Sequence, residues 1–298
     1  MDVAVDSKMV SAEGADLYTE RRGGGPALLL IPGGGGDAGP FAPLADVLAD
    51  TFTVLTYDRR GNSRSPLHGP PAPTTLAEQS ADAVAVVRAH GFNEACFFGT
   101  SGGAIIVLDL AAHHPGCMAL GVAHEPPVPK VLPDGQEILA RYDEIDRVLR
   151  TEGWLKAYRM FTTGNPMSER DQPITQYVDP TEVDPIAALP PGPMRDTMVR
   201  MNGNWEFMTT YEIKSFIHYV PDLDLIARNR VRLVLGGGSE TRSLFYHRSG
   251  RVIAERLGAE FVEFPGGHIG PFDKAPGFAQ IIRSIWLTAR QDESPRRP

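Results

Sequence analysis

Short continuous apolar runs alternate along this chain with longer segments whose apolar residues recur at helical spacing. Runs of this kind, bounded by glycine and proline, are typical of strands buried on both faces of a parallel sheet. The longer segments, such as 76–90 and 276–290, have the pattern of amphipathic helices. Strands are expected at 27–31, 51–57, 95–98, 120–123, 231–235 and 260–264, after an edge hairpin formed by 8–10 and 15–19. The pattern predicts an α/β fold with a mostly parallel central sheet flanked by helices.

The pattern changes between residues 128 and 221. Proline-rich breaks there separate helical stretches and no convincing strand is present, which indicates an inserted helical cap. The helical stretches span 136–150, 154–161, 194–201 and 211–219. We therefore expect a core from 1–127 and 222–290, a cap from 128–221, and a polar, disordered tail from 291–298.

Composition narrows the class of partner. The 298 residues are 42% hydrophobic and 22% charged, which is ordinary for a globular protein with a sizeable core. The formal net charge of -8 argues against nucleic acid or an anionic membrane, because binding phosphates requires clustered Lys and Arg. A small neutral substrate fits better, and both a monomer and a homodimer remain open.

Location and cofactors follow from what the sequence lacks. Residues 1–8 hold no basic start followed by an apolar run, and no segment has a membrane-spanning apolar length, so a cytoplasmic protein is expected. The two cysteines, Cys96 and Cys117, are expected to be reduced thiols. Neither C-x-x-C, nor H-E-x-x-H, nor a helix-opening G-x-G-x-x-G occurs, so no metal and no nucleotide cofactor are predicted.

The most informative stretch is 95–103, with the sequence A-C-F-F-G-T-S-G-G. An apolar strand runs into the G-T-S-G-G turn and a buried helix follows, which is the context of a G-x-S-x-G nucleophile elbow. Such a turn holds its serine under backbone strain, and Gly99 and Gly103 are small enough to avoid a clash. Ser101 is therefore the candidate nucleophile.

Two loops follow the first central strands. Residues 33–36 are four glycines, which let the backbone approach a ligand and leave N–H groups free to point at it. A flexible loop is the alternative. Residues 57–65, Y-D-R-R-G-N-S-R-S, resemble an anion site in composition, but a structural knot of carboxylate, guanidinium and backbone is favoured.

The parts follow one another in the order elbow serine, strand-end acid, strand-end histidine, which is the order of the α/β-hydrolase superfamily. The chain resembles that superfamily over nearly its whole length. Residues 58–65 are similar to its D-x-R-G-x-G-x-S turn, with Ser63 in place of the second glycine. The resemblance implies a cofactor-free serine hydrolase. Its oxyanion hole is then formed by the backbone N–H groups of Gly102 and Gly34, which donate hydrogen bonds to the oxyanion. Haloalkane dehalogenases and epoxide hydrolases need aspartate at the nucleophile position, so Ser101 excludes their reactions.

The resemblance also places the general base at His268, in a P-G-G-H turn after the last strand. His113 and His114 close a helix, where the helix dipole favours them. His218 is either a substrate contact or a packed residue, with packing favoured, and His247 has the pattern of a surface residue.

Two glutamates compete for the role of the acid that orients the imidazole. Glu240 lies in a G-G-G-S-E loop at the family's usual G-x-x-D position. Glu125 lies 24 residues beyond the elbow serine, at a place similar to where haloalkane dehalogenases and zearalenone lactonases keep their glutamate. A carboxylate buried there without a partner would be costly, so Glu125 is favoured. Glu240 is then expected to bond Arg242 or to support the same histidine.

Together these features predict a cofactor-independent serine hydrolase that opens an ester or lactone of a small, largely apolar substrate through an acyl-enzyme. The cap is expected to supply the pocket from Trp154, Tyr158, Trp205, Phe207, Tyr211 and His218. The same machinery could cleave a carbon–carbon bond in a diketone, or make peracids as cofactor-free haloperoxidases do. A small-ligand receptor or a noncatalytic scaffold is the non-enzymatic alternative.

Overall fold

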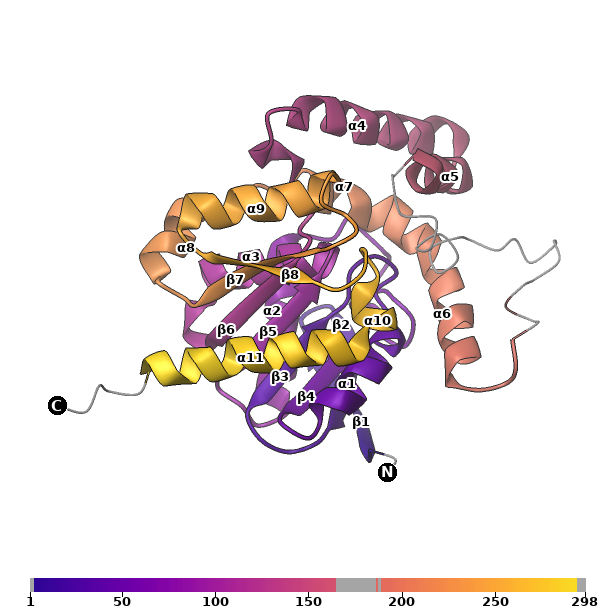
Figure 1. Cartoon of the computed structure of the whole chain (residues 1–298). Helices are drawn as coiled ribbons and strands as arrows, with labels where there is room; N and C mark the ends of the chain where they lie inside the picture. Colours follow the sequence, from indigo (N-terminus) through magenta and orange to yellow (C-terminus); the bar gives the residue numbers. More distant parts are fainter. Residues whose placement is uncertain (1–2, 165–185, 187–188, 294–298) are drawn as a thin grey trace.

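The computed structural model describes residues 3–164, 186 and 189–293. The strands of this part of the chain are β1 (Val5–Ala12), β2 (Ala15–Arg22), β3 (Ala27–Ile31), β4 (Thr53–Tyr57), β5 (Ala95–Thr100), β6 (Met118–His124), β7 (Leu233–Gly238) and β8 (Glu260–Phe264). They form one sheet in the order β1-β2-β4-β3-β5-β6-β7-β8 (Figure 1). β2 pairs antiparallel with β1 and β4, and every other pair of neighbours is parallel. The predicted mostly parallel sheet is confirmed.

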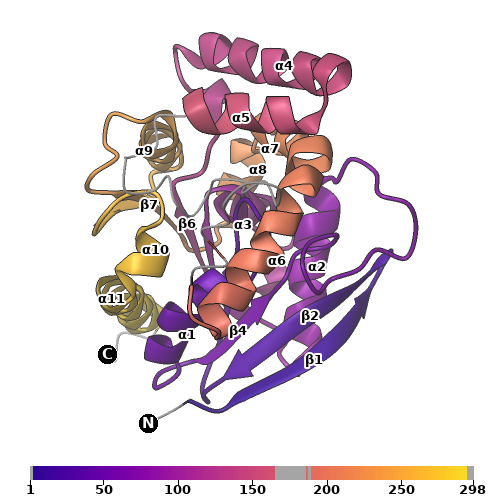
Figure 2. The same cartoon turned by 90° about the vertical axis from the view of Figure 1, so that its right-hand side faces the viewer.

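Helices cover both faces of the sheet (Figures 1 and 2). One face carries α1 (Ala42–Leu48), the short α10 (Gly270–Asp273) and α11 (Ala275–Glu293), and the other carries α2 (Leu76–Ala89), α3 (Gly102–His113), α8 (Leu223–Asn229) and α9 (Phe245–Leu257). Successive side chains of a strand point to opposite faces, so Leu28 and Leu30 of β3 join the cluster with α11. Leu29 and Ile31 join the cluster with α3. The continuous apolar run of β3 is thus buried on both sides.

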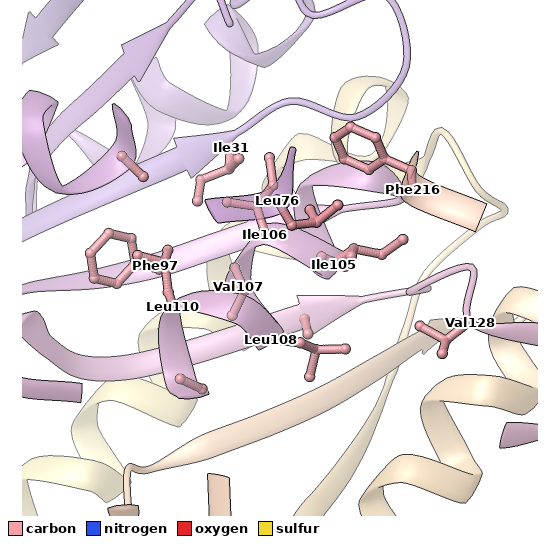
Figure 3. Close-up of a cluster of buried hydrophobic side chains, with 14 of the residues drawn as sticks. Ile31, Leu76, Phe97, Ile105, Ile106, Val107, Leu108, Leu110, Val128 and Phe216 are labelled. Carbon is pink, nitrogen blue, oxygen red and sulfur yellow. The ribbon is translucent and has the colours of Figure 1, made fainter. Parts of the chain in front are cut away.

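The helix that follows the elbow is the centre of the larger cluster. Residues 103–112 of α3 are all buried, as expected of a helix that is apolar all round. Figure 3 shows part of this cluster, which includes Ile31 of β3, Phe97 of β5 and, from the chain after β6, Val128 and Phe216. The elbow is therefore anchored in the deepest part of the core.

A helical insertion separates β6 from β7. Its elements are α4 (Gly135–Glu152), α5 (Trp154–Gly164), α6 (Pro193–Phe207), the π-helix η5 (Met208–Glu212) and α7 (Ile213–Ile217). In Figures 1 and 2, α4 and α5 lie outside the helical layers that flank the sheet. No strand occurs among the described residues of the insertion, in line with the predicted helical character. The predicted cap limits of 128 and 221 stay a prediction.

Three glycines expected in a loop belong instead to β7, which runs through Gly238. A Cβ on Gly236 would lie 2.6 Å from the Phe264 ring, and one on Gly237 would lie 2.3 Å from the His247 ring. The glycine run therefore marks a strand that is packed too closely for side chains.

The C-terminal boundary also differs from the expectation. α11 extends to Glu293, so residues 291–293 are helical rather than part of a disordered tail. Residues 294–298 lie outside the described residues.

The elbow has no room for side chains on either side of Ser101. A Cβ on Gly99 would lie 2.2 Å from the Gly103 carbonyl oxygen, and one on Gly103 would lie 2.1 Å from the Ile31 carbonyl oxygen. Real Cβ atoms do not come so close to backbone oxygens. Both positions therefore require glycine.

We expect Gly103→Ala to lower the free energy of unfolding by about 1–3 kcal/mol, because the methyl group would displace β3 from the elbow. Gly203, within α6, is the matched control, since a Cβ there meets nothing within 4 Å. Gly203→Ala is expected to stabilise by up to about 1 kcal/mol through helix propensity. Urea unfolding measures both, and a Gly103→Ala midpoint at or above that of the parent would contradict the packing argument.

Candidate active site

Ser101 lies at the sharp turn between β5 and α3. Its φ of 56° and ψ of −123° are unusual for a residue with a side chain, and backbone strain of this kind is concentrated at functional sites. The turn is held by the Ser101 N–H, which donates to the His124 carbonyl at 3.0 Å. The Ser101 carbonyl accepts from the Ala104 N–H at 2.9 Å, which starts the helix. The predicted elbow geometry is present.

The four-glycine loop packs directly against this turn. A Cβ on Gly33 would lie 2.8 Å from the Ser101 Cβ. The Gly36 N–H donates to the Gly33 carbonyl at 3.2 Å, and Gly35 has a φ of 78°, which is typical of the third residue of a type II turn. In the described part of the chain, the Gly34 N–H donates to no protein acceptor. The loop is thus an ordered turn in which the Gly34 N–H is available beside the serine.

Glu125 and His268 are in direct contact. The His268 Nδ1–H donates to Glu125 Oε2 at 2.6 Å. Glu125 Oε1 accepts from the Gly238 N–H at 2.8 Å and from the Thr241 hydroxyl. The carboxylate is fully buried, whereas the imidazole is 15% exposed. Of the two glutamate candidates, the favoured one, Glu125, is therefore the one that binds the His268 imidazole.

The charge state of Glu125 follows from these contacts. Burial raises its pKa, but the hydrogen bond from His268 and the nearby imidazoles outweigh that effect and lower the pKa to about 2. Burial lowers the pKa of the neighbouring His124 to about 4. Near neutral pH the carboxylate of Glu125 is therefore ionised and the buried imidazole of His124 beside it is neutral.

Glu240 lies in a different setting. It is exposed, and its backbone N–H donates to the Gly266 carbonyl at 3.0 Å. Arg242, one of its expected partners, binds Glu263 at 2.6 Å. The imidazole Nδ1 that either acid was expected to orient is bound by Glu125.

One cavity of about 150 Å³ is bordered by Ser101, His268, Gly33, Gly34 and Gly102. Its remaining wall is largely apolar and comes mainly from the insertion and α9: Tyr142, Phe161, Met201, Trp205, Met208, Ile213, Phe216, Ile217, Phe245 and Tyr246. A dry apolar cavity of this size holds a molecule such as benzene. The serine and the histidine, 167 positions apart in the sequence, thus face the same small apolar space.

Of the six predicted pocket residues, Trp205 is the one on the described cavity wall. Tyr158 stacks behind Trp205, with 5.6 Å between ring centroids, and Trp154 packs on Tyr158. Phe207 packs on Tyr211, with 5.2 Å between their ring centroids. These four predictions name residues that lie outside the described wall.

His218 also lies outside the described wall. Its Nε2 is 2.9 Å from Asp143 Oδ1 at the surface of the insertion. His247, expected at the surface, is only 1% exposed, because it packs under β7 against Phe261. Periodicity alone does not distinguish a buried position from a surface position for His247.

Sequence reasoning missed two features of the wall. Tyr246 of α9 packs on His268 with its ring tilted by 41° and 4.2 Å between ring centroids. Arg59 and Glu212 form a buried ion pair, with Nη1 to Oε1 at 2.7 Å. The adjacent arginines of 57–65 indicate that an ion pair forms there, but nothing in the sequence identifies Glu212 as the partner of Arg59.

The rest of segment 57–65 is the structural knot that its composition predicts. Asp58 accepts from the Ala38 N–H at 2.8 Å and from the Arg64 guanidinium at 2.6 and 2.9 Å. Arg60 donates to both carboxylate oxygens of Asp82 at 2.7 Å. Carboxylate, guanidinium and backbone are therefore bound to one another there.

Within the described residues, no three His, Cys, Asp or Glu side chains are grouped to hold a metal ion. No helix in the same residues combines the length and apolar character needed to cross a membrane. The cysteines Cys96 and Cys117 are both buried thiols.

Comparisons with known proteins show what the chain is similar to. The model of the alpha/beta hydrolase family matches residues 28–281. An uncharacterized hydrolase, YraK, of Bacillus subtilis (strain 168) is 31% identical over 272 residues, which cover 90% of this chain and 91% of that protein. A zearalenone hydrolase of Cladophialophora bantiana is 33% identical over 124 residues, 41% of this chain and 47% of its own.

A solved structure shows the same fold. The enol-lactonase from Burkholderia xenovorans LB400 matches with a TM-score of 0.66 and 19% identity, over 94% of this chain and 100% of that one. The family match spans most of the chain, and a relative is 31% identical along 90% of it. The chain therefore belongs to the alpha/beta hydrolase family.

Proposed function

We propose that this hydrolase opens a carboxylic ester or lactone of a small, largely apolar substrate, with Ser101 as its nucleophile. One observation carries the proposal: a serine on a strained elbow borders the same apolar cavity as a histidine whose Nδ1 binds a buried carboxylate. That arrangement supplies a nucleophile, a base and an orienting acid in the order that acyl transfer requires.

The proposed first step acylates the serine. Ser101 Oγ attacks the carbonyl carbon of the substrate while its proton passes to His268 Nε2. The carbonyl oxygen becomes negative and accepts from the N–H groups of Gly34 and Gly102, which border the cavity. The carbon–oxygen bond then breaks, and the leaving alcohol takes the proton from His268. In a lactone the alcohol stays attached to the acyl group.

Water completes the cycle by the reverse route. His268 takes a proton from water, and the hydroxide adds to the acyl carbon. The ester bond to Ser101 then breaks, Ser101 regains a proton, and a carboxylic acid leaves. Ionised Glu125 keeps the Nδ1–H of His268 in place and stabilises the imidazolium that forms in both steps.

The nature of the wall supports the substrate class. Aromatic, methionine and isoleucine side chains make up most of it, so an apolar acyl group or ring gains by leaving water. By their names, the zearalenone hydrolase hydrolyses zearalenone and the enol-lactonase acts on a lactone. Both considerations favour a compact, neutral ester or lactone.

The nucleophile is tested by labelling. A fluorophosphonate is expected to add one phosphonyl group to Ser101, detected by intact mass and peptide mapping. Ser101→Ala should abolish the label and reduce ester hydrolysis by about 10⁴-fold or more, because nothing then attacks the carbonyl. The denatured parent protein is the control for unspecific labelling.

A panel of phenyl esters, lactones and a diketone, with products identified by mass, gives the bond that is cleaved. A peroxide-dependent assay is run beside it. Tight binding of a small ligand by a protein that takes up no label would refute the proposed hydrolase and favour a receptor.

The two glutamates are separated by matched variants. Glu125→Gln should lower kcat about 10³- to 10⁴-fold, because a neutral amide no longer fixes the Nδ1–H tautomer or stabilises the imidazolium. Glu240→Gln, an exposed site, should stay within about threefold of the parent. Steady-state hydrolysis normalised to the labelled serine measures both. The reverse ranking would move the orienting role to Glu240.

Glu125 also makes stability depend on pH. Its pKa falls from 4.5 when free to about 2 when folded, so its contribution is complete above about pH 4.5 and is lost as the pH falls toward 2. At about 1.4 kcal/mol per pKa unit the contribution is about 3 kcal/mol.

Urea unfolding of the parent and of Glu125→Gln should therefore differ most near pH 7, and the difference should shrink as the pH falls below about 4.5. Glu240→Gln is the control and should show no such change. A difference between parent and Glu125→Gln that is constant from pH 7 to 3 would show that the folded carboxyl is not held ionised.

A further inference from the structure

A buried ion pair forms part of the cavity wall, next to the proposed oxyanion site. The Arg59 guanidinium donates to both carboxylate oxygens of Glu212, at 2.7 and 2.8 Å. The two side chains are only 1% and 2% exposed. Taking both charges out of water is costly, and such a pair is often no more stabilising than apolar residues of the same volume. The role of the pair is therefore to be sought in the groups that it contacts rather than in its contribution to stability.

The guanidinium has a third bond, to the glycine loop. Arg59 Nη2 donates to the Gly33 carbonyl at 2.9 Å. That carbonyl belongs to the same peptide group as the Gly34 N–H, and no peptide bond in the described residues is cis. In a trans peptide group the C=O and the N–H point in opposite directions. Binding the Gly33 oxygen on the Arg59 side therefore aims the Gly34 N–H at the opposite side.

The same turn is held at two further points. The Arg59 N–H donates to the Gly36 carbonyl at 2.8 Å. Asn204 Nδ2, from α6 of the insertion, donates to the Gly35 carbonyl at 2.6 Å. The carbonyls of Gly33, Gly35 and Gly36 are thus all engaged, which fixes the path of the loop around Gly34.

The partner of Arg59 comes from the insertion. Glu212 is the last residue of η5, a π-helical turn between α6 and α7, and turns of this kind are frequent at functional sites. Asn62 Nδ2 also donates to Glu212 Oε1 at 3.1 Å. The Phe216 ring of α7 lies 5.2 Å from the guanidinium carbon of Arg59, and the same ring is 3.1 Å from where a Cβ on Gly102 would be.

We infer that Arg59 and Glu212 are positioning residues for the oxyanion donor: Glu212 of the insertion orients the Arg59 guanidinium, and Arg59 fixes the Gly33–Gly34 peptide so that its N–H faces the reacting carbonyl. The inference rests on the proposed acyl transfer at Ser101. In the proposed acyl transfer neither side chain is assigned a contact with the reacting atoms. Their effect is expected on the transition state, in which the oxygen is negative, rather than on the neutral substrate.

Arg59→Lys is the sharpest variant. The ammonium keeps the charge opposite Glu212, but a single nitrogen lacks the fork that binds the carboxylate and the Gly33 carbonyl together. We expect kcat to fall about 10- to 100-fold, with KM within about threefold of the parent, because a misplaced donor costs up to about the whole of its contribution. The inhibition constant of benzeneboronic acid, which forms a tetrahedral adduct on serine, should rise by the same factor.

Arg60→Lys is the matched control. Arg60 is the next residue, and its fork binds Asp82 instead, so the same change of side chain there leaves the glycine loop untouched. It should lower the melting temperature without changing kcat or boronate inhibition per labelled serine. Glu212→Gln serves as the second variant if Arg59→Lys does not fold. It should show a smaller fall in kcat, again with KM maintained.

Rates are expressed per Ser101 labelled by the fluorophosphonate, so loss of folded protein does not count as loss of kcat. A parent that takes up no label would overturn the proposed function and the inference with it. A labelled, active parent whose Arg59→Lys variant keeps kcat and boronate affinity would overturn the inference alone. Equal losses in Arg59→Lys and Arg60→Lys would likewise reduce the pair to a general structural role.

Discussion

The buried carboxylate of Glu125 is the constraint on which the end of the sheet that carries the candidate site depends. A carboxylate with no exposed surface stays ionised only if hydrogen-bond donors replace water. Its donors come from the end of β7 at Gly238, from Thr241 beyond it, and from His268 after β8. The ends of three neighbouring strands are thereby tied to one side chain. Glu125 itself has a φ of 52°, so the backbone accepts strain to bring the carboxylate there.

A second polar layer joins the insertion to the core across the glycine loop. Asp37 accepts from Arg200 of α6 at 2.7 Å and from the Ser63 hydroxyl at 2.6 Å. Asn204 Oδ1 accepts from the Ser63 N–H at 2.8 Å. Ser63 has a φ of 50°, a conformation that suits the glycine usual at this place in the family's turn. The serine hydroxyl makes two bonds that a glycine could not make, because it donates to Asp37 of the loop and accepts from Asn204 Nδ2 of the insertion at 2.7 Å.

The parts that could be predicted are those specified by neighbours in the sequence. The elbow is recognisable because glycines two residues before and after Ser101 are sterically required. β3 is recognisable because both its faces are apolar. The choice between Glu125 and Glu240 depends on which strand end lies next to His268. The sequence pattern predicts a loop at the glycines of β7, whereas they belong to the strand. The contact between Glu125 and His268 arises only in the folded sheet.

Directions of side chains were the part that spacing did not give. Trp205 and Phe207 are two residues apart in α6, which turns them by about 200° around the helix axis. Trp205 therefore faces the cavity, while a Cβ on Gly61 would lie 2.2 Å from the Phe207 ring. Arg59 and Arg60 present the same problem, since their letters are identical and their carboxylate partners are 130 positions apart. In neither segment does the pattern of apolar and polar residues indicate which of the two side chains faces the cavity.

The electrostatics of the cavity connect these contacts to selectivity. Among the described lining residues, Arg59 and Glu212 neutralise each other, and His268 is bound to Glu125. A charged substrate would lose its hydration in the cavity and find no counter-charge there, which is unfavourable. A neutral ester does not incur this cost. In the proposed mechanism charge develops only when the carbonyl oxygen becomes negative, and N–H groups act more strongly on it in a medium of low polarity. In the proposed mechanism the N–H groups, and not the apolar wall, thus favour the anionic transition state over the neutral ground state, which is the condition for catalysis.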